Sequence, residues 1–185
     1  MIFYNGPLRT SRNTSVMTSD YMLLELHGGY PLLRVNHGSG EARLEIDARD
    51  ATRNTRQQQL NDGRCHRIDV FRRGRQVRLV VDECRAAQID ESEMKQKSSQ
   101  QRQWCETATS TPGSSRYLNV HTPLQLGGRS DAGHDFPIGV QKHGLHGCIK
   151  NFRHNGQVRD ACVRNKCLSD LLLVSCCDKV CWNAI

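Results

Sequence analysis

Short apolar segments, each followed by a turn rich in glycine or asparagine, are the feature that most restricts how this chain can fold. We expect strands at residues 2–5, 20–26, 30–36, 42–47, 65–71, 77–81, 118–120, 124–126 and 147–152. In residues 42–47 apolar and polar side chains alternate, as they do in a strand with one buried face. The sequence contains no convincing amphipathic helix. The pattern therefore predicts an all-β sandwich or barrel.

Glycine and asparagine also mark the expected turns between these strands. Gly28-Gly29 separates two expected strands, and Arg73-Gly74 predicts a hairpin that joins residues 65–71 to residues 77–81. Asn155-Gly156 is a residue pair that type I′ turns favour, because both central residues of that turn need a positive φ.

The size and charge of the chain limit its class without identifying a partner. Its 185 residues suit one domain with a short appendage. A net charge of +7 is compatible with nucleic acid, anionic glycans or an acidic membrane surface. No apolar run reaches the length of a membrane-spanning helix, so we expect no membrane span within the chain. The first residues lack the basic start and apolar stretch of a signal peptide.

Two stretches depart from the strand pattern. Residues 88–116 are polar, rich in Ser, Gln and Thr, and almost without aliphatic side chains, which predicts a long inserted surface loop. Residues 161–185 form a tail with irregularly spaced cysteines, and a truncated or frameshifted reading frame explains it as well as a real fold does. Zinc ligands in this tail would be Cys162, Cys167, Cys177 and Cys181. Because Cys176 adjoins Cys177 and a paired repeat is missing, zinc is the poorer interpretation.

Nine cysteines fit an oxidising compartment with disulfides better than a cytosolic thiol enzyme. Because nine is odd, at least one cysteine is reduced or pairs outside this chain. Cys84 and Cys105 bracket the polar loop and are expected to be partners, which would stabilise the fold by about 3 kcal/mol in the simple entropy model. Asn13 begins an Asn-Thr-Ser glycosylation sequon, usable only if the chain is secreted.

Five segments resemble, in order, the pattern of a laminin G-like domain, and they are most similar to the laminin G module of invertebrate neural-type cadherins. They read FYNGP, DYMLLELHGGYPLLRVNHGSG, LNDGRCHRIDVFRRGRQVRLVVDEC, YLNVHTPLQLGG and GLHGCIKNFRHNG. The resemblance covers residues 1–160 and implies a jelly-roll sandwich of two antiparallel sheets. The chain departs from the family in two ways. The family's preceding N-terminal strand is missing, and Cys65 occupies a position that is usually aromatic.

The resemblance implies a calcium site at the rim of the sandwich. Asp20 and Asn155 match the family's side-chain ligands, and the backbone carbonyls of His37 and Arg153 fall at the other two ligand positions. Calcium favours such oxygen ligands, and a single carboxylate predicts a weak site. The alternative is that Asp20 caps a strand and Asn155 only supplies a turn conformation.

The family also implies that Cys148 forms a disulfide with a cysteine near the end of the domain. In this chain the competing partners are Cys162, Cys167, Cys176 and Cys177. An epidermal-growth-factor-like module often follows the domain in this family.

Arginines are concentrated around the expected hairpin. They are Arg64, Arg67, Arg72, Arg73, Arg75 and Arg78, opposed only by Asp69. A solvated hairpin tip is one interpretation. The other is a patch for sulfated glycans, centred on Arg72, Arg73 and Arg75. Nucleic acid fits the charge but not the compartment, and we expect no aromatic stacking platform near these arginines.

Nothing in the sequence predicts catalysis. The chain lacks Gly-x-Ser-x-Gly, His-Glu-x-x-His and phosphate-cradling glycine motifs, and its histidines are expected to be scattered over the surface. The predicted function is that of a non-enzymatic module on the outer side of a single-pass, cadherin-type receptor. It would support calcium-dependent adhesion to cell-surface proteins, including the same cadherin on a neighbouring cell. The alternative is a secreted, heparin-binding, lectin-like domain.

Overall fold

The computed structural model describes residues 1–7, 20–46, 59–83, 105–120, 122–128, 144–158 and 181–184. The predicted positions Asn13 and Cys84 lie outside these ranges, as do most of the polar loop and of the cysteine-rich tail. Within the described residues, no helix has the length and apolar character needed to cross a membrane.

The described residues form β-strands joined by turns and extended segments. The strands are β1 (Phe3–Asn5), β2 (Tyr21–His27), β3 (Tyr30–Asn36), β4 (Glu41–Glu45), β5 (His66–Arg73), β6 (Gln76–Val81), β7 (Glu106–Ser110), β8 (Gln125–Leu126), β9 (Cys148–Lys150), β10 (Arg153–His154), β11 (Gln157–Val158) and β12 (Cys181–Ala184).

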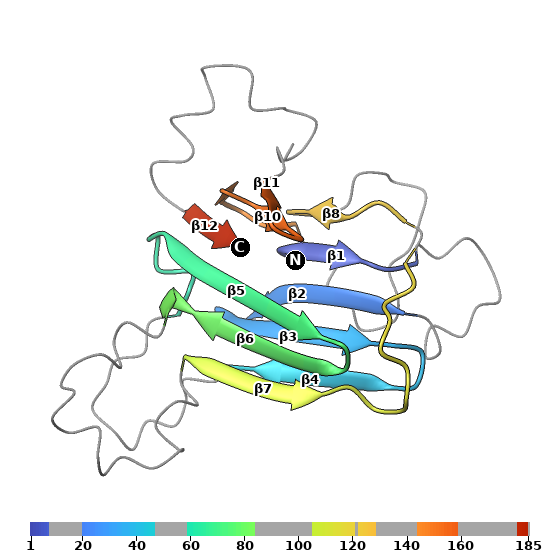
Figure 1. Ribbon diagram of the computed structural model, residues 1–185. Coiled ribbons are helices and arrows are strands. Elements are labelled where there is room, and N and C mark those ends of the chain that lie inside the picture. Colours follow the sequence, from blue (N-terminus) through green and yellow to red (C-terminus); the bar gives the residue numbers. More distant parts are fainter. Residues whose placement is uncertain are drawn as a thin grey trace, which may run out of the picture.

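Two sheets lie face to face (Figure 1). The first has the strand order β4-β3-β2-β1-β8, and the second has the order β7-β6-β5-β12-β9. All pairs are antiparallel except those of β12, which runs parallel to both β5 and β9. Strands β10 and β11 form a separate hairpin. The predicted all-β sandwich of two antiparallel sheets is confirmed.

The predicted turns form where glycine and asparagine allow a positive φ. Gly28 and Gly29 have φ values of 59° and 90° and connect β2 to β3. Asn155 and Gly156, with φ values of 52° and 76°, connect β10 to β11 and confirm the expected type I′ pair. Gly74, at φ 58°, takes the first central position of the β5–β6 hairpin.

The core between the sheets draws side chains from both of them. Its members include Leu24, Leu33, Val35 and Leu44 from the first sheet and Ile68, Val77, Leu79 and Ile149 from the second. On β4 the buried residues alternate with exposed or half-buried ones, as the sequence pattern predicts. Both sheets therefore contribute an apolar face to one core, which holds the sandwich together.

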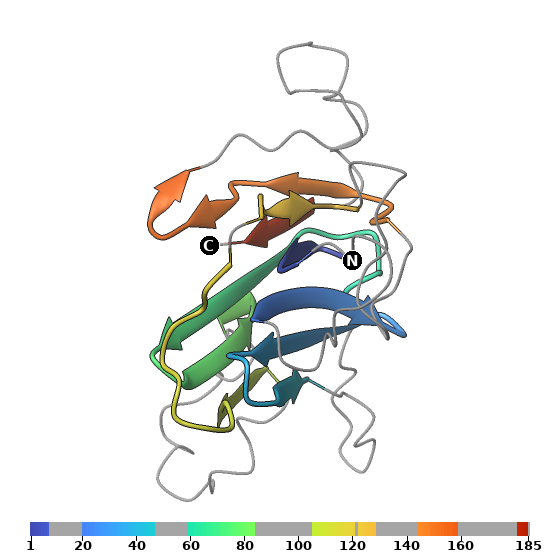
Figure 2. The ribbon, with the colours of Figure 1, turned by 90° about the vertical axis from the view of Figure 1, so that its right-hand side faces the viewer.

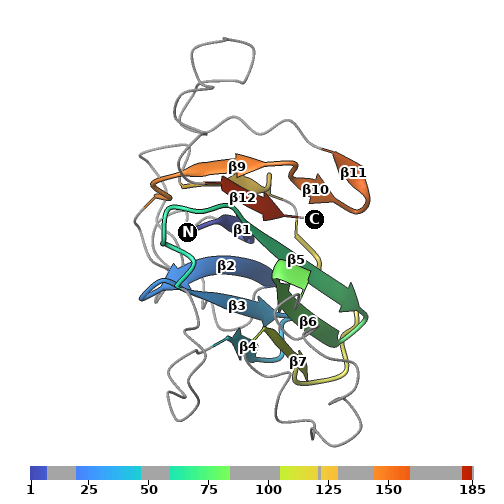
Figure 3. The same ribbon diagram turned by 90° about the vertical axis from the view of Figure 1, so that its left-hand side faces the viewer.

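Three elements differ from expectation. Glu106–Ser110 lies in the predicted polar loop but forms β7, because threonine suits an edge strand whose side chains remain in water. Residues 118–120 are extended but pair with no strand in the described structure. Cys181–Ala184, in the tail expected to be irregular, forms β12, which pairs with β5 on one side and β9 on the other (Figure 3).

Cys65, which takes an aromatic position of the family pattern, lies exposed and not in the core.

Candidate functional site

One end of the sandwich collects most of the predicted site residues, and we call it the rim. Here β1 and β3 end and β2 begins, since Asn5 pairs with Met22 and Tyr21 pairs with Asn36. The segment of residues 111–120 passes the tip of the β5–β6 hairpin on its way from β7 to β8 (Figure 2). The β10–β11 turn completes the rim, because Asn155 lines the same cleft as Asn5 and Met22.

Asp20 lies at the start of β2 and is half-buried. The backbone N–H of Asn119 donates a hydrogen bond to Asp20 Oδ2 at 2.6 Å. The second carboxylate oxygen of Asp20, Oδ1, accepts no hydrogen bond from the described residues. The carboxylate is therefore held in place by one oxygen and has the other available for a cation.

His37 follows β3 and is buried, with 2% of its surface exposed. Its Nδ1 lies 2.8 Å from the hydroxyl oxygen of Thr111. Burial lowers the pKa of His37, and the nearby charge of Arg72 lowers it further, while Asp20 opposes this effect. The buried ring lies directly after β3, at the residue whose backbone carbonyl is one of the predicted ligands.

The other two predicted ligands lie in the β10–β11 hairpin. Arg153 and Asn155 are exposed and line a cleft together with Leu118 and Val120. Leu118 and Val120 flank Asn119, whose backbone N–H donates a hydrogen bond to Asp20. The structure thus brings Asp20, His37 and the hairpin to one end of the sandwich. The donor types fit calcium, which favours carboxylate, amide and carbonyl oxygens.

The predicted arginines lie at the tip of the β5–β6 hairpin, where Arg72, Arg73 and Arg75 are exposed. A fourth arginine, Arg116, joins them. The Arg72 guanidinium donates to the Arg116 carbonyl oxygen at 3.2 Å, and Arg75 donates to the carbonyl of Gly113. We call Arg72, Arg73, Arg75 and Arg116 the hairpin patch. None of the four forms an ion pair within the described parts of the chain.

Sequence reasoning missed Arg116 because it lies far from the hairpin along the chain. Only the path of residues 111–120 brings it alongside Gly74. A Cβ atom built on Gly74 would lie 3.8 Å from the Arg116 side chain. The polar residues around Arg116 in the sequence do not indicate that it lies beside Gly74.

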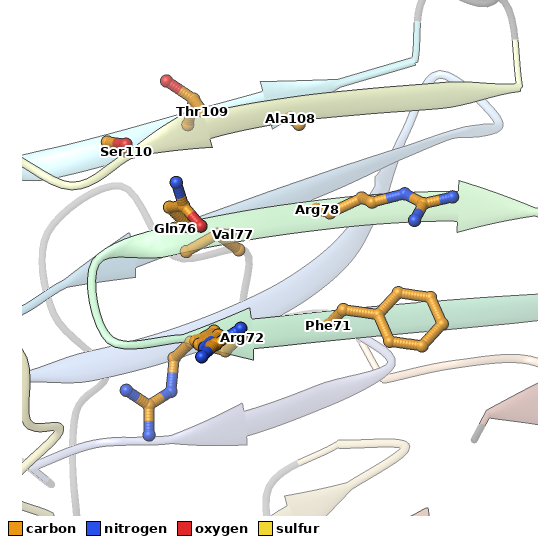
Figure 4. Close-up of a pocket in the computed structure, with 9 residues that line it drawn as sticks. Phe71, Arg72, Gln76, Val77, Arg78, Ala108, Thr109 and Ser110 are labelled. Atoms are coloured by element: carbon orange, nitrogen blue, oxygen red, sulfur yellow. The ribbon is translucent and has the colours of Figure 1, made fainter.

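Two exposed aromatic side chains lie in the same part of the chain as these arginines. Phe71 is 53% exposed and Tyr117, next to Arg116, is 75% exposed. The Arg78 guanidinium lies 5.4 Å from the centre of the Phe71 ring, and its Nε lies 2.7 Å from Glu106 Oε1. Phe71 on β5 and Arg78 on β6 line a shallow depression of about 590 Å³ on the outer face of the second sheet, together with Ala108, Thr109 and Ser110 of β7 (Figure 4).

The laminin G domain model matches residues 1–157. The chain belongs to the laminin G domain family. The domain is 36% identical over 164 residues to Cadherin-related hmr-1 from Caenorhabditis elegans, and 33% identical over 165 residues to Neural-cadherin from Drosophila melanogaster. It is also 32% identical over 165 residues to Putative neural-cadherin 2 from the same fly.

Each of these alignments covers 86% of the laminin G domain chain. The chain spans only 5% of the first two relatives and 9% of the third. The predicted resemblance is confirmed, and the similarity to the relatives concerns one module within much longer proteins.

The cysteines of the domain are described only in part. Cys105 is buried and disulfide-bonded, and its carbonyl oxygen accepts a hydrogen bond from Val81 N–H at 2.8 Å. Cys84 lies outside the described residues, so its pairing with Cys105 stays a prediction. The backbone of Cys148 is in register with that of Cys181 across β9 and β12. The partners that the sequence predicts for Cys148, which are Cys162, Cys167, Cys176 and Cys177, do not include Cys181.

Proposed function

We propose that this laminin G domain is a non-enzymatic, extracellular adhesion-type module of a cadherin-type receptor and that it meets cell-surface partners through its rim. The observation that carries the proposal is the 36% identity to Cadherin-related hmr-1 over 86% of the chain. Rim residues come from turns and strand ends, where binding residues are commonly found on a rigid β-scaffold. The parent receptor would place the domain outside the cell.

Calcium binding at the rim is part of this proposal. Asp20 Oδ1 and the Asn155 amide oxygen would be the side-chain ligands, with the carbonyls of His37 and Arg153 as the others. One carboxylate gives the site little negative charge, so the expected Kd is about millimolar, in the range of extracellular calcium modules.

Titration calorimetry of the full chain with calcium tests the site. Asp20→Asn preserves an oxygen that can accept the Asn119 N–H bond but removes the charge, so we expect weaker binding. Asn155→Gly removes the amide while keeping the positive φ of 52°. Asn151→Gly, at another residue with φ 52°, is the matched control and should bind calcium like the wild type. Equal affinity in all four proteins, or no saturable binding, would refute the site.

Homophilic adhesion is tested by coating beads with the full chain. We expect the beads to aggregate in millimolar calcium and to disperse when a chelator is added. Beads coated with Asp20→Asn should aggregate less than wild-type beads at the same calcium concentration. If wild-type beads stay dispersed in calcium, the homophilic partner is wrong, and binding to other cell-surface proteins becomes the next measurement.

The hairpin patch favours a second candidate function, which is binding of sulfated glycans. Its four exposed arginines have no acidic partner among the described residues, and they can donate paired hydrogen bonds to sulfate groups. We expect Arg73→Gln combined with Arg75→Gln to lower the salt concentration at which the protein elutes from heparin. Arg43→Gln combined with Arg64→Gln removes the same charge from exposed positions outside the patch. Equal reductions in both double variants would show that only net charge matters.

A further inference from the structure

A cleft opens between the two sheets at the rim, and its volume is about 580 Å³. Its apolar walls include Met22, Leu24, Ile68, Val70, Leu124 and Phe152. Of these, Leu24 and Ile68 are almost fully buried, at 1% and 2% exposure. Small-molecule sites commonly have volumes of about 300–1,000 Å³ and mostly apolar walls. The cleft therefore has the size and lining of a site for a small apolar group.

Basic side chains also line this cleft. Arg72 comes from the end of β5, and Arg153 and His154 come from β10. Neither arginine forms an ion pair within the described residues, and Arg72 uses Nη1 for the carbonyls of Gly74 and Arg116. All three basic residues are exposed, so they lie where the cleft meets solvent. An anionic group bound there would find two guanidinium groups and an apolar interior behind them.

We propose that the cleft binds a small amphipathic carboxylate, with its acyl chain between the sheets and its carboxylate at Arg72 and Arg153. This ligand class follows from two separate properties of the cleft, which are its apolar walls and its basic mouth. The site goes beyond an adhesion function, although Asn155 lines the cleft and also belongs to the proposed calcium set.

The probes are dodecanoate and dodecanol, titrated below their aggregation limits into the full chain by calorimetry, with and without calcium. We expect saturable binding of dodecanoate and at least about tenfold weaker binding of dodecanol. Equal affinity for dodecanoate and dodecanol would overturn the role of the arginines. Absence of saturable dodecanoate binding would overturn the site.

Variants locate the binding in the cleft. Val120→Trp, at a half-buried cleft residue, should fill the space and abolish dodecanoate binding. Arg72→Gln combined with Arg153→Gln should weaken dodecanoate binding about tenfold or more. Arg43→Gln combined with Arg64→Gln, which removes the same charge from exposed positions outside the cleft and the hairpin patch, should leave it unchanged. Wild-type affinity in both cleft variants, or an equal loss in the control, would overturn the proposal. Heparin elution and bead aggregation report on the other proposals separately.

Discussion

At the scale of single residues, His66 shows that burial and partners, and not the residue type, decide the state of a side chain. We expected the histidines to be scattered over the surface, yet His66 is 4% exposed. Its Nδ1 lies 2.8 Å from Asp82 Oδ2, and its Nε2 lies 2.9 Å from Asp62 Oδ1. Both ring nitrogens can donate only when the imidazole is protonated. The hydrogen bond to Asp82 raises the pKa of His66; burial opposes this, and Asp62 adds to it.

This geometry predicts a pH-dependent contribution of His66 to stability. Because the folded-state pKa is raised above 6.5, the contribution is fully present below the unfolded-state pKa and is lost as pH rises through the folded-state value. We expect His66→Gln to lower the free energy of unfolding by about 1–3 kcal/mol near pH 6 and by less near pH 9. Urea unfolding of both proteins across this range measures the difference. A loss that is constant or grows with pH would contradict the protonated clamp.

At the scale of elements, the β2–β3 hairpin depends on a backbone conformation that few side chains tolerate. Gly28 has a φ of 59°, and a Cβ atom built on it meets nothing within 4 Å. A side chain at this position therefore has space, and any cost of substitution comes from the backbone alone. The register from Tyr21↔Asn36 to His27↔Tyr30 leaves only Gly28 and Gly29 to form the turn.

We expect Gly28→Ala to destabilise the fold by about 1–2 kcal/mol, because alanine disfavours a left-handed conformation. Gly28→Asn should recover much of this loss, since asparagine tolerates that conformation better. Thermal or urea unfolding of the three proteins makes the comparison. If alanine and asparagine give equal losses, side-chain contacts and not φ would be responsible.

At the scale of the whole molecule, two sheets share one core while their outer faces serve other roles. Leu79 on β6 faces the core and has 0% exposure, whereas its near neighbour Phe71 on β5 is 53% exposed on the outer face. Phenylalanine is the larger side chain, so size alone predicts that its removal costs more stability. Burial predicts the opposite, that removing Leu79 costs more. The sandwich makes burial the deciding property.

Leu79→Ala should lower the free energy of unfolding by about 2–5 kcal/mol, because it leaves a cavity in the shared core. Phe71→Ala should lower it by less than about 1 kcal/mol, since that ring already contacts water and loses only its stacking with Arg78. Chemical denaturation of both variants provides the test. A larger loss for Phe71→Ala would mean that the outer face is covered in solution.

The disulfide also acts at this scale, because it would close the loop between the end of β6 and the start of β7. Peptide mapping without reductant should recover Cys84 joined to Cys105. Replacing both residues by serine should lower the free energy of unfolding by about 3 kcal/mol in the chain-entropy model. Recovery of Cys105 with another cysteine would refute this pairing while leaving β6 and β7 in place.

The sequence by itself determined the fold class, most strands and the turns. Alternation of apolar residues sets which face of a strand is buried, and glycine or asparagine alone accepts the positive φ of the turns. It also identified three of the four patch arginines. These signals are local, since each depends on residues within a few positions of one another.

Only the tertiary structure decided which distant residues meet. Arg116 reaches the hairpin patch, Asn119 binds Asp20, and Asp82 binds His66 through contacts between residues far apart in the sequence. Strand β7 also depends on the tertiary structure, because its polar sequence forms a strand by pairing with the exposed edge of β6. The physical reason is the same in each case. Periodicity along a chain specifies which side of a strand is buried, but not which other strand lies against it.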